Sequence, residues 1–219
     1  MTIKGMKKRI NTILWKSRRW VIRKYYHLSL GGENSHISII SCNCIGGVVM
    51  SELGMSFMTP TVNLFFSSPD FVKFCENLEY YLSVIPKNGG KALEGYPLVI
   101  LDDIIINAVH YNDFNHFLNT WNKRKKRVNF KRLFLIFTDR DGFTSDLLPR
   151  IAVLPYKKVL FSNRKYENYD FVCTVPGFED EACVGSLVEY IGISGKRIYS
   201  IYPFAKIFKR MIADNGGSL

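Results

Sequence analysis

Short runs of apolar and β-branched residues alternate along this chain with segments that show helical periodicity. Strands that alternate with helices are typical of an α/β fold in which a mostly parallel sheet carries helices on both faces. The sequence therefore predicts a Rossmann-like layered α/β domain over residues 31–219, preceded by a basic amphipathic N-terminal helix within residues 1–30. The expected strands lie at residues 36–41, 61–66, 96–100, 103–110, 132–137, 157–162, 169–175 and 197–201.

Two of the expected helices carry clear end signals. The run Ser67-Ser68-Pro69-Asp70 provides a serine cap, a proline at the first helical position and an acid in the first turn, and the apolar pattern continues to residue 85. A second amphipathic helix is expected over residues 112–127, and it ends in five consecutive cations. Cations suit the negative end of a helix dipole, which favours a solvated helix terminus over a nucleic-acid or lipid site.

The positive charge of the chain is concentrated at its N-terminus. The chain has 30 basic and 19 acidic residues, and nine of the basic ones lie within residues 1–24, which contain no acidic residue. Basic residues interleaved with Trp15 and Trp20 indicate a helix on the anionic surface of the inner membrane, or a helix packed on the domain with a solvated basic face. The remaining residues are nearly neutral, which does not favour nucleic acid as a partner.

The chain is expected to be cytoplasmic, with peripheral attachment to the inner membrane through residues 1–24. No apolar run reaches the roughly 18 residues that a membrane helix needs, and the N-terminus lacks the pattern of a secretion signal. The five cysteines are too few for a disulfide scaffold. Their one close pair, Cys42 and Cys44, has a spacing that does not favour zinc.

Polar and ionisable residues follow several of the expected strands. In parallel sheets ligands bind beyond the carboxyl ends of the strands, so we expect these residues to share one edge. The edge would hold Ser67-Ser68, Ser162-Asn163 and three groups of candidate site residues: Ser41, Asn43, Cys44, Gly46 and Gly47; His110 and Tyr111; and Thr138, Asp139, Arg140 and Asp141.

The stretch "SCNCIGG" is expected to join the first strand to a helix. Gly46 and Gly47 allow a ligand to approach the backbone, and free N–H groups at a helix start attract phosphate, although the stretch matches neither a P-loop nor a dinucleotide motif. A helix N-terminus lowers the pKa of a thiol, so Cys44 is a candidate nucleophile with His110 as its base. The alternative is that Cys44 is a small buried residue at a tight turn.

The stretch "FTDRDG" places two carboxylates after the most apolar strand. Asp139 and Asp141 can hold Mn²⁺ or Mg²⁺, and the metal in turn can bind a nucleotide diphosphate. Arg140 between them can neutralise a phosphate. His110 is a candidate general acid or base at the same edge, with Tyr111 beside it. The alternative is that the aspartates serve ordinary turn and helix-cap chemistry.

Taken as an ordered set, these motifs resemble a bacterial family, the domain-of-unknown-function family 1919, often labelled exopolysaccharide biosynthesis protein. The family reads Ser-x-Asn-Cys-x-Gly-Gly at the first junction, so Cys42 falls on a variable position. The resemblance implies a role in the assembly of surface polysaccharide and implies no particular reaction. The matching stretches are "ISIISCNCIGG", "LGMSFMTPTVNLFF", "DFVKFCENLEYYL", "YPLVILDDIIINAVHY", "WNKRKKRVNF" and "FTDRDG".

These observations lead to one expected function and two alternatives. The expected function is transfer of a sugar or another activated group, with a nucleotide sugar or glycan precursor as the ligand. The first alternative is a non-catalytic accessory module of the polysaccharide machinery, and the second is an acyl transferase or hydrolase that uses Cys44 and His110. For the transferase we expect Cys44, His110, Asp139 and Asp141 to be catalytic, and Ser41, Asn43, Gly46, Gly47, Tyr111, Thr138 and Arg140 to bind substrate.

Overall fold

A computed structural model of the chain describes residues 19–30, 36–191 and 196–214. The chain divides into two compact units, and we describe each by itself: a larger unit of residues 37–47 and 57–185, and a smaller unit drawn from residues 1–36, 48–56 and 186–219. Residues 19–29 of the smaller unit are helical. The rest of the predicted basic helix lies outside the described residues, so that helix as a whole stays a prediction.

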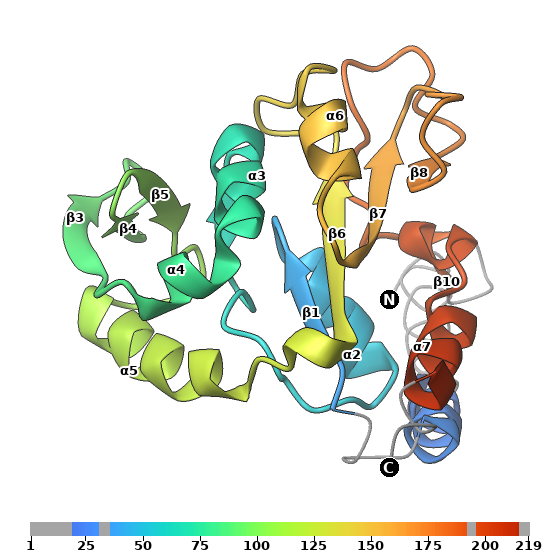
Figure 1. The fold of residues 1–219 in the computed structure, drawn as a ribbon, viewed down its shortest axis with the longest axis horizontal. Coiled ribbons are helices and arrows are strands. Elements are labelled where there is room, and N and C mark those ends of the chain that lie inside the picture. The colour runs from blue at the N-terminus through green and yellow to red at the C-terminus, as the bar shows by residue number, and fades with distance from the viewer. Residues whose placement is uncertain (1–18, 31–35, 192–195, 215–219) are drawn as a thin grey trace, which may run out of the picture. The chain divides into compact units, whose positions relative to one another are not determined.

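The larger unit contains a four-stranded parallel sheet (Figure 1). Three of its strands are buried along most of their length, as expected for a parallel sheet covered by other elements, and the edge strand at residues 172–174 is partly exposed. Helix α2 (Ile45–Glu52) begins directly after the first strand. The predicted α/β class with a parallel sheet is therefore confirmed. In spatial order the strands are β1 (Ser38–Ser41), β6 (Leu133–Thr138), β7 (Lys157–Ser162) and β8 (Val172–Thr174).

Three of the strands expected in the parallel sheet instead lie in a separate antiparallel sheet, which corrects the prediction. Leu101 pairs with Ile104, so only two residues connect their strands. A connection of two residues can form only an antiparallel hairpin, whereas a parallel crossover needs a dozen or more. The order of this sheet is β2 (Phe65–Phe66), β5 (Ile104–Asn107), β4 (Pro97–Leu101) and β3 (Lys87–Lys91), of which β3 was not expected.

Two helices of the larger unit, at residues 68–76 and 114–124, begin directly after a capping side chain. The Ser67 hydroxyl accepts a hydrogen bond from the Asp70 amide (3.2 Å), and the Asp113 carboxylate accepts one from the His116 amide (2.8 Å). The first predicted helix is divided at Asn77, whose backbone is not helical (φ −128°, ψ 46°). The helices are α3 (Ser68–Glu76), α4 (Leu78–Ser83), α5 (Phe114–Arg124), followed by a 3₁₀ turn (Lys125–Arg127), and α6 (Leu147–Ala152).

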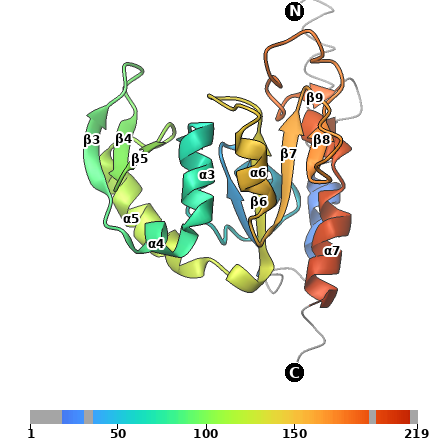
Figure 2. The same cartoon turned by 45° about the horizontal axis from the view of Figure 1, so that its top comes forward.

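Helix α3 lies between the two sheets in both views of the ribbon (Figures 1 and 2). The Phe74 ring lies 5.3 Å from that of Phe66 in β2 and 6.4 Å from that of Trp121 in α5. On the other side, the Phe71 ring lies 5.0 Å from that of Phe137 in β6. One hydrophobic core therefore joins both sheets of the larger unit.

The smaller unit combines the helix at residues 19–29 with the second half of α2 and the C-terminal segment. Glu52 of α2 forms ion pairs with both of the other parts, because its carboxylate lies 2.6 Å from Arg197 Nε and 3.4 Å from Arg19 Nε. None of the helices in the described part of the chain combines the length and the hydrophobicity that a membrane span requires. The C-terminal elements are β9 (Tyr190–Ile191), antiparallel to β10 (Lys196–Arg197), a 3₁₀ turn (Ile198–Ile201) where a longer strand was expected, and α7 (Phe204–Asp214).

Candidate functional site

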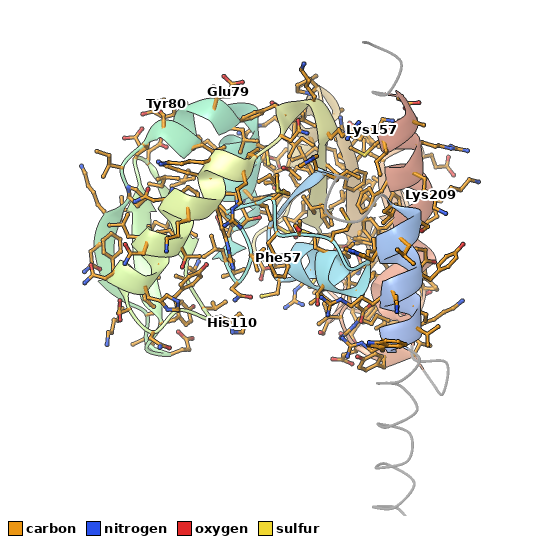
Figure 3. All side chains as sticks on the ribbon, turned by 90° about the horizontal axis from the view of Figure 1, so that it is seen from below. Phe57, Glu79, Tyr80, His110, Lys157 and Lys209 are labelled. Atoms are coloured by element: carbon orange, nitrogen blue, oxygen red, sulfur yellow. The ribbon has the colours of Figure 1, made fainter. Side chains whose placement is uncertain are left out.

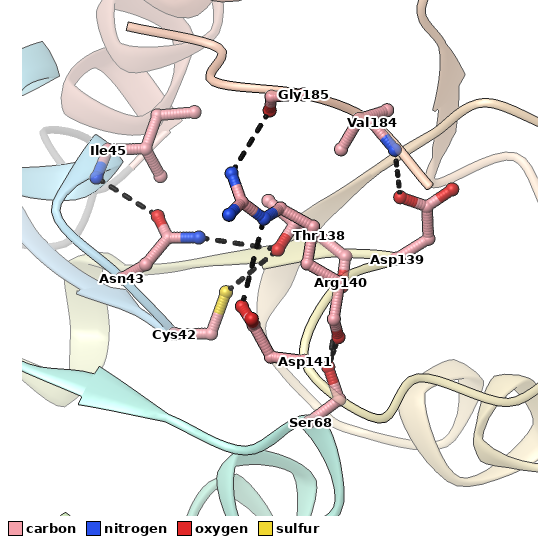
Figure 4. Close-up of polar contacts among 10 residues, drawn as sticks. All are labelled: Cys42, Asn43, Ile45, Ser68, Thr138, Asp139, Arg140, Asp141, Val184 and Gly185. Atoms are coloured by element: carbon pink, nitrogen blue, oxygen red, sulfur yellow. Dashed lines mark hydrogen bonds and ion pairs between the residues drawn. The ribbon is translucent and has the colours of Figure 1, made fainter. Parts of the chain in front are cut away.

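The loop after β6 stands at the carboxyl edge of the parallel sheet, and the buried Asp139 carboxylate anchors it (Figure 4). One carboxylate oxygen accepts a hydrogen bond from the Val184 amide (2.8 Å). The other accepts one from the Asn163 amide (2.7 Å) and one from the Ser162 hydroxyl (2.9 Å). Asp139 therefore joins the ends of β6 and β7 to the segment that contains Val184.

Ser68, at the start of α3, holds the same loop from the other side. Its hydroxyl donates to the Arg140 carbonyl (2.6 Å), and its amide donates to the Asp141 carbonyl (2.8 Å). Asp141 and Gly142 both have left-handed backbone angles (φ 60° and 83°). Such a conformation is uncommon for a residue other than glycine and persists only where its surroundings impose it. These contacts fix the backbone that carries the side chains of Arg140 and Asp141.

Arg140 and Asp141 are the half-buried charged groups of this loop. Arg140 Nη1 donates to the Gly185 carbonyl (3.3 Å), and Arg140 Nε lies 3.9 Å from the Asp141 carboxylate. Burial raises the pKa of the Asp141 carboxyl, and the positive charge of Arg140 opposes that shift. The pair can present donors to a phosphate and, beside them, a carboxylate suited to proton transfer.

The corner after β1 meets the end of β6, as predicted. The Asn43 side chain accepts a hydrogen bond from the Ile45 amide (3.1 Å) and donates one to the Thr138 hydroxyl (3.3 Å). Cys42 Sγ lies 3.5 Å from the same hydroxyl, and burial raises the pKa of this thiol to about 11. The structure therefore brings Asn43 and Thr138 together at the edge where Arg140 and Asp141 follow.

Gly46 and Gly47 allow α2 to pack closely on its neighbours. A Cβ atom at Gly46 would lie 2.7 Å from Ser41 Cβ, and one at Gly47 would lie 3.2 Å from Val62 Cγ1. The Gly46 amide already donates to the Ser41 hydroxyl (3.3 Å). Close packing thus explains both glycines, and phosphate binding by their amides stays a prediction.

Replacing Gly46 with Ala is expected to destabilise the protein by about 1–3 kcal/mol, because the added methyl group meets the side chain of Ser41 in a buried site. Gly47→Ala is the matched control and should change stability little. Its added methyl group would lie 3.2 Å from Val62 Cγ1, a less severe contact, and the better helix propensity of alanine offsets the cost. Urea unfolding followed by circular dichroism measures both. Equal losses for the two variants would contradict the packing argument.

The structure does not support Cys44 as an activated thiol. Its side chain is half-buried, and burial raises the pKa of its thiol, which is the opposite of the shift expected at a helix N-terminus. A thiol with a raised pKa stays protonated at neutral pH and is a poor nucleophile.

His110 and Tyr111 do not lie at the edge of the parallel sheet, so their predicted placement is wrong. They follow β5 of the antiparallel sheet, and His110 is exposed (Figure 3). Tyr111 is buried, and its hydroxyl donates to the Val62 carbonyl (3.3 Å) and accepts a hydrogen bond from Arg124 (3.3 Å). The reason is the short hairpin between β4 and β5, which commits β5 to the antiparallel sheet.

The predicted metal pair divides into two different environments. Both carboxylate oxygens of Asp139 accept hydrogen bonds from protein donors, which take three of the roughly four acceptor positions of this carboxylate, whereas Asp141 is half-buried beside Arg140. Within the described part of the chain, no three histidine, cysteine or acidic side chains come together as metal ligands. A Mn²⁺ or Mg²⁺ site at Asp139 and Asp141 remains a prediction, and no chemical step below depends on it.

The supporting residues of the site were only partly predictable. Ser68, Ser162 and Asn163 follow strands or begin a helix at the expected edge, and all three contribute hydrogen bonds there. The amide of Val184 and the carbonyl of Gly185 were missed. Both are backbone groups of an irregular segment, and such groups leave no signal in a sequence.

Comparison with known proteins gives a family and one relative. Residues 16–209 match the family described as "Domain of unknown function (DUF1919)". A Haemophilus influenzae protein named "Uncharacterized protein" is 30% identical over 201 residues, which cover 91% of this chain and 96% of that protein. Neither the description nor the name states a reaction or mentions exopolysaccharide.

Proposed function

This chain belongs to the DUF1919 family, and we propose that it transfers a group from an activated sugar during bacterial surface-polysaccharide synthesis. The observation that carries the proposal is the braced loop that presents Arg140 and Asp141 at the carboxyl edge of the parallel sheet. In open α/β sheets this edge is where ligands bind. On this proposal the parallel sheet acts as a Rossmann-like platform for the sugar donor.

Arg140 is the group that would recognise the donor. A guanidinium offers several N–H donors in a fixed plane, which suits the oxygens of a diphosphate. The Gly185 carbonyl takes one of these donors and orients the side chain, which remains half-buried at the edge. Asn43 and Thr138 supply neutral polar groups beside it.

Asp141 is the group that would activate the acceptor. Its raised pKa makes it a better base at neutral pH than an ordinary carboxylate. Asp141 would take the proton of an acceptor hydroxyl as the hydroxyl oxygen bonds to the anomeric carbon of the donor sugar. The bond from that carbon to the diphosphate breaks, and the nucleoside diphosphate leaves beside Arg140.

The proposal is tested by titrating UDP- and GDP-activated sugars in a calorimeter and by following the release of the nucleoside diphosphate. Arg140→Gln is expected to weaken donor binding about tenfold or more, because hydrogen bonds to charged groups are lost. Asp141→Asn is expected to bind the donor like wild type but to lose about 100-fold or more in turnover. Asp146→Asn, a change of an exposed aspartate after the same loop, is the matched control.

The results for the wild-type protein also distinguish the transferase from a non-catalytic accessory module. Binding of an activated sugar without turnover would favour the accessory module. The transferase proposal fails if no activated sugar binds, or if Arg140→Gln binds the donor as tightly as Asp146→Asn does.

We further propose that the chain is a cytoplasmic protein held peripherally on the inner membrane through residues 1–24. The support is the charge of this segment, nine cations without an acid, together with its tryptophans.

A further inference from the structure

A cavity of about 560 Å³ lies within the smaller unit. Its walls come from the helix at residues 19–29, from the second half of α2, and from the segment between β10 and the start of α7. This volume is in the range of cavities that bind small organic ligands. The site proposed above for sugar transfer belongs to the larger unit, so this cavity is a second and separate feature.

The cavity is positively charged. Four cations line it, Arg19, Arg23, Lys196 and Lys206, and Glu52 is its one acidic lining residue among those described. Glu52 is already engaged, because it pairs with Arg197 (2.6 Å) and accepts a hydrogen bond from the Tyr199 hydroxyl. Arg23 and Lys206 also line the cavity, and their side chains make no ion pair or hydrogen bond with any part of the chain that the structure describes. The free charge in the cavity therefore suits an anion.

The rest of the lining is largely apolar and aromatic. Trp20, Ile22, Tyr26, Tyr202 and Phe204 contribute to the walls. A small hydrated anion such as free phosphate gains little from such surfaces. An anion attached to an apolar group can use both kinds of lining.

The same helix exposes an apolar stripe, which consists of Trp20, Val21, Tyr25 and Leu28. Their exposed fractions are 63%, 58%, 60% and 70%. Two lysines accompany the stripe: Lys24 Nζ lies 5.2 Å from the Trp20 ring, and Lys209 Nζ, labelled on α7 in Figure 3, lies 5.7 Å from the Tyr25 ring. Exposed apolar patches mark contact surfaces, and aromatic residues with lysines are typical of membrane interfaces.

We propose that the cavity binds the phosphate headgroup of an anionic phospholipid while the stripe enters the headgroup region of the bilayer. Trp20 belongs to both features and connects them. Charge complementarity selects this occupant, since the cavity and the stripe present cations beside apolar surface. The inference deepens the membrane attachment proposed above by adding a specific lipid site, and it does not depend on the transfer reaction.

The test is sedimentation of the full chain with vesicles of phosphatidylcholine alone and with vesicles of equal parts phosphatidylcholine and phosphatidylglycerol. Wild type is expected to bind the anionic vesicles far more strongly. Each cation at an anionic surface adds about fivefold to the affinity, so Arg23→Gln with Lys206→Gln should weaken binding about 30-fold. The matched control is Lys126→Gln with Arg127→Gln, which removes the same two charges from an exposed turn of the larger unit. Trp20→Ser should weaken binding even though it leaves the charge unchanged.

Several results would overturn the lipid site, and they differ in meaning. Equal losses of vesicle binding in the two double variants would mean that the lipid surface attracts the total positive charge of the protein and that no specific site exists. Normal binding by the Arg23/Lys206 variant, with loss only on deletion of residues 1–18, would leave the membrane attachment standing without the cavity. Complete competition by inorganic phosphate at constant ionic strength would assign the cavity to a free anion. A dimer in solution that Trp20→Ser abolishes would assign the stripe to a second copy of the chain.

Discussion

Replacing Asp139 with Asn is expected to lower the free energy of unfolding by about 3–5 kcal/mol, because buried donors left without acceptors cost about 1–3 kcal/mol each. The carboxylate accepts from two amides and one hydroxyl, and the –NH₂ group of an asparagine side chain would face donors in place of an acceptor. Urea unfolding followed by circular dichroism at neutral pH measures the change. A large loss would identify Asp139 as the structural anchor of the site loop.

Asp141→Asn is the matched control, two residues further along the same loop. Burial raises the pKa of Asp141 in the folded protein, so the stability that protonation of this group provides is lost as the pH rises through that pKa. At neutral pH the asparagine variant should therefore be as stable as wild type or slightly more stable. If Asp139→Asn proved as harmless as Asp141→Asn, the anchoring role would be wrong, and Asp139 would become available for the predicted metal.

Replacing Phe74 with Ala is expected to cost about 3–5 kcal/mol, as is usual for a large aromatic residue in a close-packed core. Its ring contacts those of Phe66, Tyr81 and Trp121, with centroids 5.3–6.4 Å away. Because one core joins both sheets, hydrogen exchange should quicken together in β6 of the parallel sheet and in β4 and β5 of the antiparallel sheet.

Leu93→Ala serves as the control for Phe74, since Leu93 is fully exposed and its loss should change stability by no more than about 0.5 kcal/mol. Faster exchange confined to one sheet of the Phe74 variant would show that the two sheets do not share a cooperative core. A cost near that of Leu93→Ala would show that the cavity is filled by rearrangement of the surrounding rings.

Local signals in the sequence identified most of the regular elements. The strand at 157–162 has the predicted bounds, and the strands at 36–41 and 132–137 were placed to within two residues. The start of α3 was predictable because a serine cap acts on the adjacent turn, and the structure shows which serine of the pair, Ser67, provides it. Strand β3, "KNGGK", was missed because it is exposed at all five residues and therefore lacks an apolar pattern.

Which sheet each strand joins was harder to predict from the sequence, although the two-residue turn between β4 and β5 indicates part of the answer. Asp102 and Asp103 occupy a turn of two residues, and Asp102 has a left-handed backbone (φ 59°) that aspartate tolerates better than most residues. Because a two-residue turn can form only an antiparallel hairpin, β5 pairs with β4 in the antiparallel sheet. His110 and Tyr111 follow β5 in the chain and therefore do not lie at the edge of the parallel sheet. Apolar runs indicate that a strand is buried but do not indicate which strand it pairs with.

What the sequence by itself determined is local: the α/β class, most strands and helix starts, and the polar edge around Asn43, Thr138 and Arg140. Only the tertiary structure decided what each polar group does, because that depends on the partners that distant segments bring. Asp139 and Asp141 have equivalent side chains in "FTDRDG", but their environments differ. The Asp139 carboxylate is buried and accepts hydrogen bonds from Ser162, Asn163 and Val184, whereas the Asp141 carboxylate is half-exposed beside Arg140. The cationic cavity likewise exists only where residues 19–29 meet the C-terminal segment, since two of its cations lie at positions 19 and 23 and the other two at positions 196 and 206.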